Sequence, residues 1–179
     1  MVKFKQFLIS AWEIVEVLVV AIVAVWLIRS FLIQPFLISG ASMEPNFSDG
    51  HYLLVDQVTY KFREPQRGEI AVFRSPADSS IFFIKRLIGL PGESIVVKGG
   101  SVFINGEQLK EGYIASDLKT FGDQNLTLEE NEYFVLGDNR AFSFDSRNWG
   151  PLGRERVIGV VRLRLWPLNQ AMAIEAPAY

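Results

Sequence analysis

One apolar run near the start of the chain constrains the fold more than any other feature of the sequence. From Phe7 to Ile28, the only charged residues are Glu13 and Glu16. As an α-helix this run would be about 33 Å long, which is enough to cross the hydrocarbon core of a bilayer. We therefore predict one N-terminal transmembrane helix, with its glutamates near one end, where a charge costs less free energy than at the centre.

Two other interpretations of this run remain open. One is a cleaved signal peptide, because Ser39 and Ala41 form a small-x-small pattern like that of a cleavage site. Against it, the run is longer than the usual apolar segment of such a peptide, which has about 7–15 residues. The other is a buried core helix. The register of a spanning helix is also open, because Val17 to Ile33 is long enough if Arg29 extends its charge to the interface.

Charges around the run predict its orientation. Two lysines precede it, and no Lys or Arg occurs between Arg29 and Lys61. Positive residues are typical of the cytoplasmic side of a membrane helix. We therefore predict that residues 1–34 form a cytoplasmic N-terminus with a single-pass anchor, and that residues 35–179 form a β-rich extracytoplasmic domain. The short chain and the single anchor favour the plasma membrane of a bacterium, with this domain on its outer face.

The composition excludes several kinds of site. The chain of 179 residues has no cysteine, one histidine (His51) and a net charge of −2. Disulfides, thiol catalysis and multi-histidine metal sites are therefore excluded, and a Ser-His-Asp triad has little support. No basic run is present, so nucleic-acid binding has no electrostatic support. We expect no metal, no cofactor and no nucleic-acid partner, and we expect His51 to be a partly exposed residue at the start of a strand.

The rest of the chain is typical of a mainly β domain. Short apolar runs alternate with Gly, Pro and Asn turns, and no second long amphipathic helix is evident. Pro35 is expected to end the N-terminal helix, Asn105-Gly106 predicts a tight hairpin, and Lys110–Asn131 is polar enough to be a surface insertion. The predicted strands are Tyr52–Val55, Glu69–Phe73, Ile81–Gly89, Ser94–Val97, Ser101–Ile104, Glu132–Leu136 and Val157–Leu165.

Two polar residues stand out in this apolar background. Ser42 follows the small residues Ser39–Ala41, which let another backbone approach closely. Lys85 lies between Phe83 and Leu87 on one face of its predicted strand, where loss of hydration would lower the pKa of its amine. A neutral lysine can take the proton of a serine hydroxyl without a histidine. Each feature alone also fits a structural role, as an ordinary loop or as a strand-edge lysine whose amine reaches water.

Three separated segments, taken together, resemble the type I signal peptidases. They follow the apolar run in the order found in that family, and the resemblance covers nearly the whole chain except Lys110–Asn131 and the C-terminal end. It implies a signal-peptidase-like catalytic domain, a β-barrel or sandwich, on a membrane anchor. The segments are Ser42-Met43-Glu44-Pro45, then Lys85-Arg86-Leu87-Ile88-Gly89-Leu90-Pro91-Gly92-Glu93, and Gly137-Asp138-Asn139-Arg140 continuing through Ser143 to Asp145-Ser146-Arg147.

The resemblance also implies a division of catalytic roles. Ser42 would be the nucleophile and Lys85 its general base. Ser143 would orient the lysine amine through a hydrogen bond, and Asp145 with Arg147 would support the site from behind as a charged pair. The implied reaction cleaves secretory preproteins after their signal peptides, through an acyl-enzyme that water hydrolyses. The implied partners are therefore preproteins and the lipid bilayer.

Substrate recognition is implied by the same resemblance. The family cleaves after small side chains in an A-x-A pattern, and shallow apolar pockets receive those side chains. The residues implied to line the pockets in this chain are Phe36, Ile38, Met43, Phe47 and Ile84.

The chain departs from the family pattern at two places. Many relatives have a serine two positions before the nucleophile, and its hydroxyl helps to stabilise the oxyanion. This chain has Gly40 there, so the backbone N–H of Ser42 would carry most of that stabilisation. The third segment has Ala141-Phe142 where many relatives carry Asp-Asn, which affects local hydrogen bonding and not the role of Ser143.

Two competing functions fit part of this pattern. A self-cleaving Ser-Lys repressor-type protease would need a DNA-binding domain and no membrane span, and this chain has the opposite pattern. A catalytically silent, membrane-tethered β domain could bind extended peptides by strand addition. The joint presence of Ser42, Lys85 and Ser143 argues against this second function. We therefore expect a membrane-bound serine endopeptidase that uses a Ser-Lys dyad.

Overall fold

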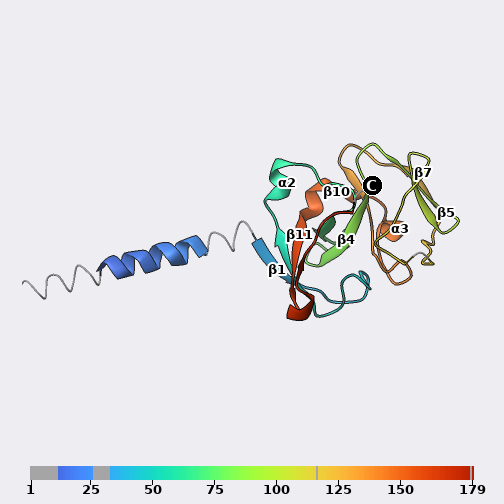
Figure 1. Cartoon of the computed structure of the whole chain (residues 1–179). Helices are drawn as coiled ribbons and strands as arrows, with labels where there is room; N and C mark the ends of the chain where they lie inside the picture. Colours follow the sequence, from blue (N-terminus) through green and yellow to red (C-terminus); the bar gives the residue numbers. More distant parts are fainter. Residues whose placement is uncertain (1–11, 26–32, 116, 178) are drawn as a thin grey trace, which may run out of the picture.

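The computed structural model describes residues 12–25, 33–115, 117–177 and 179, and it is mainly β (Figure 1). Most strands belong to one antiparallel eight-stranded sheet. Its order is β1 (Ile33–Leu37), β2 (Tyr52–Asp56), β11 (Val157–Trp166), β3 (Ile70–Arg74), β4 (Phe82–Gly89), β9 (Glu132–Leu136) and β10 (Leu152–Gly153), with β12 (Met172–Ala173) paired to β11. This sheet positions the residues discussed below.

A second sheet of four strands packs beside the first. Its order is β7 (Glu107–Gln108), β6 (Ser101–Ile104), β5 (Ser94–Lys98) and β8 (Gln124–Thr127). The described residues also include two short helices, α2 (Thr59–Phe62) and α3 (Ser146–Trp149), and two 3-10 turns, η1 (Arg154–Arg156) and η2 (Leu168–Gln170).

The seven predicted strands are confirmed, each to within one residue at either end. They were predictable as short apolar runs bounded by turn residues. In β5 and β6 the side chains alternate between the core and a less buried side, whereas in β3 and β9 nearly all are buried. The predicted hairpin is also confirmed. Asn105 and Gly106 have φ angles of 52° and 87°, which a two-residue turn between twisted strands requires.

The prediction that Pro35 ends a helix is wrong. Pro35 lies in the middle of β1, opposite Leu54 of β2. Proline is compatible with this place because β1 is an edge strand, so one side of it has no partner to which an N–H must donate. The sheet therefore begins at Ile33. The sequence also gave no sign of β8, which lies inside the insertion Lys110–Asn131 and pairs with β5.

Three apolar clusters hold the domain together, and β3 separates two of them. Ala71 and Phe73 pack on one face of the large sheet, while Ile70 and Val72 pack on the other. Because both faces are covered, β3 is buried along almost its whole length. The third cluster joins the sheets. It consists of Ile88, Phe134 and Leu136 from the large sheet with Ile95, Val97, Val102, Ile104 and Leu128.

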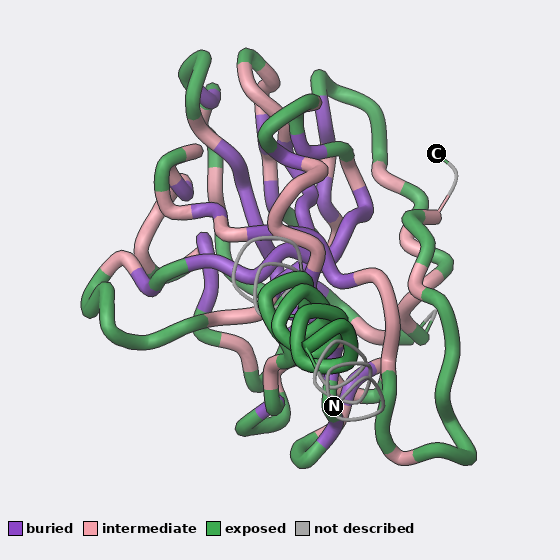
Figure 2. The backbone as a smooth tube through the Cα atoms, turned by 90° about the vertical axis from the view of Figure 1, so that its left-hand side faces the viewer, coloured by how far each residue is buried: buried purple, intermediate pink, exposed green. Residues whose placement is uncertain are grey.

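Residues 12–25 form a helix whose described residues are all exposed, as the green tube in Figure 2 shows. No helix among the described residues has both the length and the apolar character needed to cross a membrane. The predicted span from Phe7 to Ile28 continues at both ends into residues 1–11 and 26–32, which lie outside the described part of the chain.

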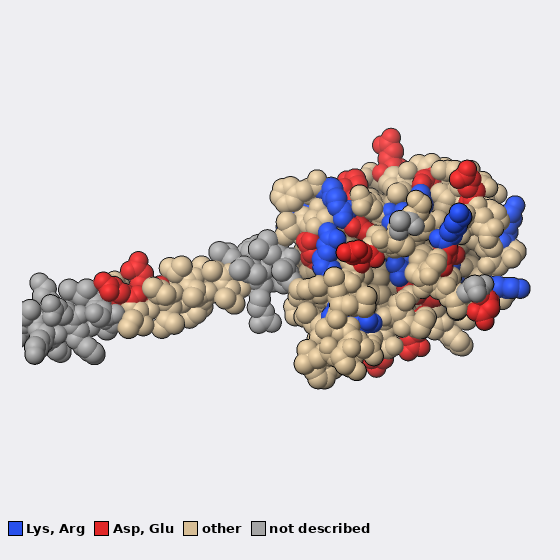
Figure 3. All heavy atoms as spheres, in the orientation of Figure 1, with Lys and Arg blue, Asp and Glu red and all other residues tan. Residues whose placement is uncertain are grey.

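Charged residues are distributed unevenly between surface and interior. On the face seen in Figure 3, Lys and Arg are interspersed with Asp and Glu over the β domain. Apart from Glu69, the buried charged residues of the described chain come from β4 and from the loop after β9. They are Lys85, Arg86, Asp138, Arg140 and Asp145. Since burying charge is costly without partners, this concentration marks the region where a functional site is expected.

Replacing Gly89 by alanine tests how closely the two sheets pack. A Cβ at Gly89 would lie 2.8 Å from Leu128 Cδ1 and 2.9 Å from Phe134 Cβ. Because both neighbours belong to the core, we expect Gly89→Ala to lower the free energy of unfolding by about 1–3 kcal/mol, as overpacking typically does. Urea denaturation measures the difference. Gly112→Ala is the matched control, because a Cβ there meets nothing within 4 Å. Equal losses in the two variants would contradict close packing at Gly89.

Candidate active site

The loop that carries Ser42 is fixed at both ends. The carboxylate of Asp49 accepts a hydrogen bond of 2.7 Å from the backbone N–H of Gly40. Met43 and Phe47 anchor the other end, since their side chains are buried in the core cluster that covers one face of the large sheet. Contrary to the prediction, neither residue lines the groove beside Ser42 described below, because both side chains point into the core.

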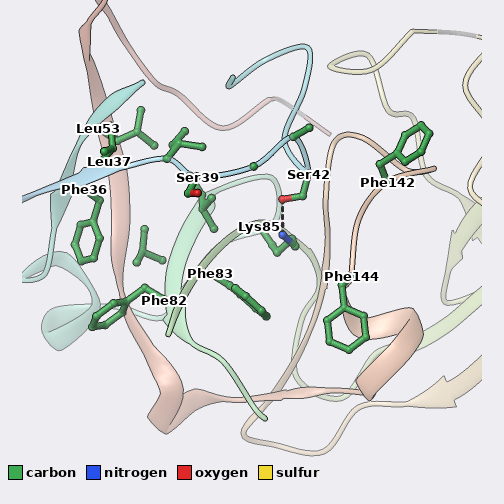
Figure 4. Close-up of a pocket in the computed structure, with 15 residues that line it drawn as sticks. Phe36, Leu37, Ser39, Ser42, Leu53, Phe82, Phe83, Lys85, Phe142 and Phe144 are labelled. Atoms are coloured by element: carbon green, nitrogen blue, oxygen red, sulfur yellow. Dashed lines mark hydrogen bonds between the residues drawn. The ribbon is translucent and has the colours of Figure 1, made fainter. Parts of the chain in front are cut away.

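Ser42 and Lys85 are brought into direct contact, although they lie far apart in the sequence. Lys85 Nζ donates a hydrogen bond of 2.6 Å to Ser42 Oγ (Figure 4). The lysine is only 3% exposed, and its amine lies 5.4 Å from the centre of the Phe83 ring. Burial lowers the pKa of Lys85 to about 8, even though the nearby carboxylates of Asp145 and Asp138 act in the opposite direction. The desolvation expected from the flanking apolar residues is therefore present.

The loop after β9 holds the Ser42 loop from the opposite side. Asn139 donates two hydrogen bonds to it, from its backbone N–H to Ser42 O at 3.1 Å and from Nδ2 to Ala41 O at 3.0 Å. Gly137 allows this approach, because a Cβ at that position would collide with Ser42 O and with the side chain of Ser143. The sequence motif contained both residues, but nothing in the sequence assigned them this contact.

Asp145 and Arg147 form the charged pair that was expected behind the site. Arg147 Nε donates to Asp145 Oδ1 at 2.8 Å, and Arg147 Nη2 donates to Asp145 Oδ2 at 2.9 Å. Asp145 Oδ2 also accepts a 3.0 Å hydrogen bond from the N–H of Gly137, and the same side chain caps helix α3. The pair therefore fixes the loop whose Gly137 packs against Ser42.

Ser143 lies in this loop, but its hydroxyl does not reach the amine of Lys85 as expected. Within the described chain, Ser143 Oγ is buried and has no hydrogen-bond partner. It lies against Gly137. Lys85 Nζ donates a hydrogen bond to Ser42 Oγ instead. Buried hydroxyls without a partner are uncommon in folded proteins, so this one calls for an explanation.

A groove of about 370 Å³ opens beside Ser42 and Lys85. Of the predicted pocket residues, Phe36, Ile38 and Ile84 line it. Phe36 packs edge-to-face on Phe82 with 5.4 Å between the ring centres. The other apolar residues in the lining were not predicted, although Phe83 and Phe82 lie two and three residues before Lys85 in its strand. The additional large side chains are Leu37, Leu53, Val72, Phe82, Phe83, Phe142 and Phe144 (Figure 4).

Unpaired strand edges border this groove. β4 pairs with β3 from Phe82 to Arg86, but its pairing with β9 begins only at Arg86. The segment Phe82–Lys85 therefore has one edge without a strand partner in the described structure. β1 likewise pairs on one side only, with β2. Exposed edges of this kind provide backbone groups with which an extended peptide can pair.

Ser42 lines the groove, and its backbone N–H donates no hydrogen bond within the described residues. Gly40 has no side-chain donor to add to it, and its φ of 99° explains why glycine suits this position. A serine would be strained in that conformation. Gly40 therefore shapes the loop through its backbone.

A second buried ion pair lies directly behind Lys85, and no role was predicted for it. Arg86 donates to both carboxylate oxygens of Asp138, from Nε at 2.8 Å and from Nη2 at 2.6 Å. Asn46 Nδ2 also donates to Asp138 Oδ2 at 2.8 Å. The pair thus connects the strand of Lys85 to the loop of Ser42. The sequence alone does not indicate burial of Arg86, and only the fold shows that its side chain is buried.

His51 lies away from this chemistry. It is buried, and not partly exposed as predicted, because its Nδ1 accepts a 3.2 Å hydrogen bond from the N–H of Ser48 inside the turn before β2. Within the described ranges, no group of three or more His, Cys, Asp and Glu side chains is arranged to hold a metal ion.

The chain matches the family model described as signal peptidase, peptidase S26, over residues 11–166. It is 37% identical over 166 residues to a probable signal peptidase I-2 of Synechocystis sp., covering 89% of this chain and 75% of that protein. It is 35% identical over 171 residues to a signal peptidase I of Bacillus licheniformis, covering 90% and 91% of the two chains. A crystal structure of a signal peptidase I from Enterococcus faecalis V583 matches at 37% identity with a TM-score of 0.49, over 55% of this chain and 97% of that one. From the family model and the two sequence relatives, we conclude that the chain belongs to the signal peptidase family, peptidase S26, and is a serine peptidase.

Proposed function

We propose that this peptidase removes signal peptides from secretory preproteins after A-x-A sites, with Ser42 as nucleophile and Lys85 as general base. The observation that carries the proposal is the 2.6 Å hydrogen bond between Lys85 Nζ and Ser42 Oγ, formed by a buried lysine. A lysine whose pKa is about 8 has an appreciable neutral fraction near pH 7. It can therefore accept the serine proton, which an ordinary solvated lysine rarely can.

The proposed reaction has two halves. Neutral Lys85 takes the proton of Ser42 Oγ, and this oxygen attacks the carbonyl carbon of the last alanine of the signal peptide. The N–H of Ser42 stabilises the oxyanion. Protonated Lys85 then gives its proton to the leaving amine, which frees the mature protein. In the second half, Lys85 activates a water molecule that hydrolyses the acyl-enzyme and restores the Ser42 hydroxyl.

The surrounding residues support this exchange of protons. Once Ser42 Oγ is acylated, Lys85 loses its present acceptor, whereas the buried hydroxyl of Ser143 has no hydrogen-bond partner within the described chain. We propose that Ser143 then accepts a hydrogen bond from the amine and orients it. Asp145 and Arg147 act indirectly, since they hold the loop that carries Ser143 and Gly137.

Substrate selection is proposed to follow from the groove. An extended peptide can pair with the free edge of Phe82–Lys85 and place alternate side chains on the apolar floor. Phe36, Ile38 and Ile84 already occupy much of this floor, so small side chains such as alanine fit best. Phe82 reinforces the wall by packing on Phe36.

We further propose that residues 1–34 anchor the enzyme in a bacterial plasma membrane, with a cytoplasmic N-terminus and the catalytic domain on the outer face. The apolar sequence from Phe7 to Ile28 supports this proposal. So does the exposure of every described side chain of the helix 12–25, because such a surface is unfavourable in water. The lipid bilayer would then be a partner, and no nucleic acid is expected to bind.

Loss of the Ser42 hydroxyl should abolish cleavage. Purified protein in detergent is incubated with a preprotein that carries an Ala-x-Ala site, and mass spectrometry identifies the new N-terminus. We expect wild type to cleave after the second alanine and Ser42→Ala to lose at least about 10³-fold in kcat/KM, as other serine peptidases do without their nucleophile. Cleavage by neither protein, with a folded domain and a validated substrate, would instead favour a peptide-binding module.

The rate should depend on pH through Lys85. Because only the neutral amine accepts a proton, kcat/KM is expected to rise with pH and to level off above about 8. Initial rates between about pH 6 and 10 at constant ionic strength give the profile. Lys85→Arg should be inactive across this range, since a guanidinium stays protonated, whereas the exposed Lys61→Arg should keep the wild-type profile. A flat or falling wild-type profile would exclude Lys85 as the base.

Membrane attachment can be tested on the full chain expressed in bacteria. We expect it to stay in the membrane pellet after alkaline carbonate extraction and to be degraded by protease added outside spheroplasts. Introducing two lysines, Val19→Lys with Val20→Lys, should release the protein, because a lysine near the bilayer centre costs about 2.5–3.5 kcal/mol. Recovery of wild type in the soluble fraction would refute the anchor.

A further inference from the structure

A short segment of the insertion, Glu111–Tyr113, is tied to three residues that adjoin the active site. Its partners are Asn46, Arg86 and Arg140. We propose that Glu111 and Tyr113 are positioning residues for the peptidase reaction. They hold three elements in place relative to one another: the loop that carries Ser42, strand β4 with Lys85, and the loop that carries Asn139. Neither residue lines the groove, so any effect on catalysis must pass through these partners.

Glu111 is the counter-charge of a fully buried arginine. Arg140 Nη1 donates to Glu111 Oε2 at 2.9 Å, and Arg140 Nη2 donates to Glu111 Oε1. The arginine side chain is 0% exposed, and its Nε donates to the carbonyl of Gly137 at 3.0 Å. Arg140 follows Asn139, which bonds the backbone of Ala41 and Ser42. The pair therefore fixes the loop that holds the nucleophile.

Tyr113 joins the other two elements. Its ring lies 4.0 Å from the guanidinium carbon of Arg86, the residue next to Lys85. Its carbonyl accepts a 2.8 Å hydrogen bond from Asn46 Nδ2, the side chain that also bonds Asp138. Its hydroxyl donates to Glu111 Oε1 at 2.6 Å, so both members of the segment act as one unit.

The electrostatics explain why the segment would matter for geometry. Burial lowers the pKa of Arg140, while Glu111 and, to a smaller extent, Asp138 raise it. Without Glu111, Arg140 would be a buried cation left with the attraction of Asp138. Asp138 is shared with Arg86 and Asn46. Competition for it would shift the strand of Lys85 against the loop of Ser42. Because misplacement by about 1 Å can cost on the order of 10²-fold in rate, a small shift is enough to measure.

The chain offers a matched control in Glu69. Its carboxylate also accepts both terminal nitrogens of an arginine, Arg63, together with a tyrosine hydroxyl, that of Tyr60 at 3.1 Å. In this second triad Glu69 and Tyr60 are buried, while the side chain of Arg63 is 33% exposed. The triad braces helix α2, and its hydrogen bonds reach none of the residues around Ser42. Glu69→Gln and Glu111→Gln therefore remove the same kind of interaction at different places.

The experiment compares the two full-chain variants with wild type. Thermal unfolding measures stability, and kcat and KM are measured on the preprotein substrate. We expect Glu111→Gln to lose on the order of 10-fold or more in kcat with KM changed less than about twofold, and Glu69→Gln to keep wild-type kcat whatever its own drop in melting temperature. Glu111→Asp, which keeps the charge, should recover part of the lost rate. Equal effects of Glu69→Gln and Glu111→Gln on kcat, or no effect of Glu111→Gln, would overturn the proposal.

A second measurement does not depend on the substrate, although the proposal itself rests on the proposed function. Hydrogen exchange by mass spectrometry should show faster exchange of residues 41–47 and 137–142 in Glu111→Gln than in Glu69→Gln. Tyr113→Leu, which removes the ring from Arg86, should behave like Glu111→Gln in this assay. If wild type cleaves no preprotein, the proposed function fails, while the exchange data still test whether Glu111 and Tyr113 hold the two loops. Unchanged exchange in both loops would overturn this positioning role.

Discussion

Burial of the Lys85 amine against Ser42 is the constraint on which the rest of the structure depends. Lowering its pKa from 10.5 to about 8 costs the folded state about 3 kcal/mol at neutral pH. Lys85 lowers the free energy of unfolding because its amine binds a proton less tightly in the folded chain than in the unfolded chain. Below pH 8 the folded chain must hold a desolvated ammonium, and this cost shrinks as pH rises toward the unfolded pKa of 10.5. The large sheet and its apolar clusters must therefore provide enough stability to hold a dry lysine beside a serine.

The carboxylates near Lys85 must be neutralised, because their charges also affect the pKa of its amine. Asp145 and Asp138 both raise the pKa of Lys85, so free carboxylates there would keep it protonated. Each is instead bound by an arginine, Arg147 or Arg86. The arginines reduce the net negative charge that the amine experiences while the carboxylates still hold the backbone in place. Buried ion pairs contribute little to stability by themselves, so their value here is geometric.

The sequence predicted what depends on local pattern. Seven strands followed from short apolar runs between turn residues. Ser42 was singled out by the small residues before it, Lys85 by its apolar neighbours, and both by the family resemblance. What depends on long-range packing was missed. From sequence alone, a charged residue such as Arg140 is expected at the surface. It is buried here because residues far along the chain pair with it. The direction of the Met43 side chain was equally hard to predict, because an apolar residue beside the nucleophile can face either the groove or the core.

The open edge of the sheet and the reactivity of the lysine have a common origin in the course of β9. This strand pairs with β4 from Arg86 onward and leaves the preceding residues unpaired. Lys85 is therefore the last residue before the sheet opens. On its closed side the apolar clusters and ion pairs remove water, which lowers its pKa. On its open side, the groove gives an extended peptide access to Ser42. One residue farther into the sheet, the amine would be out of reach of a substrate, and one residue farther out it would be hydrated and protonated.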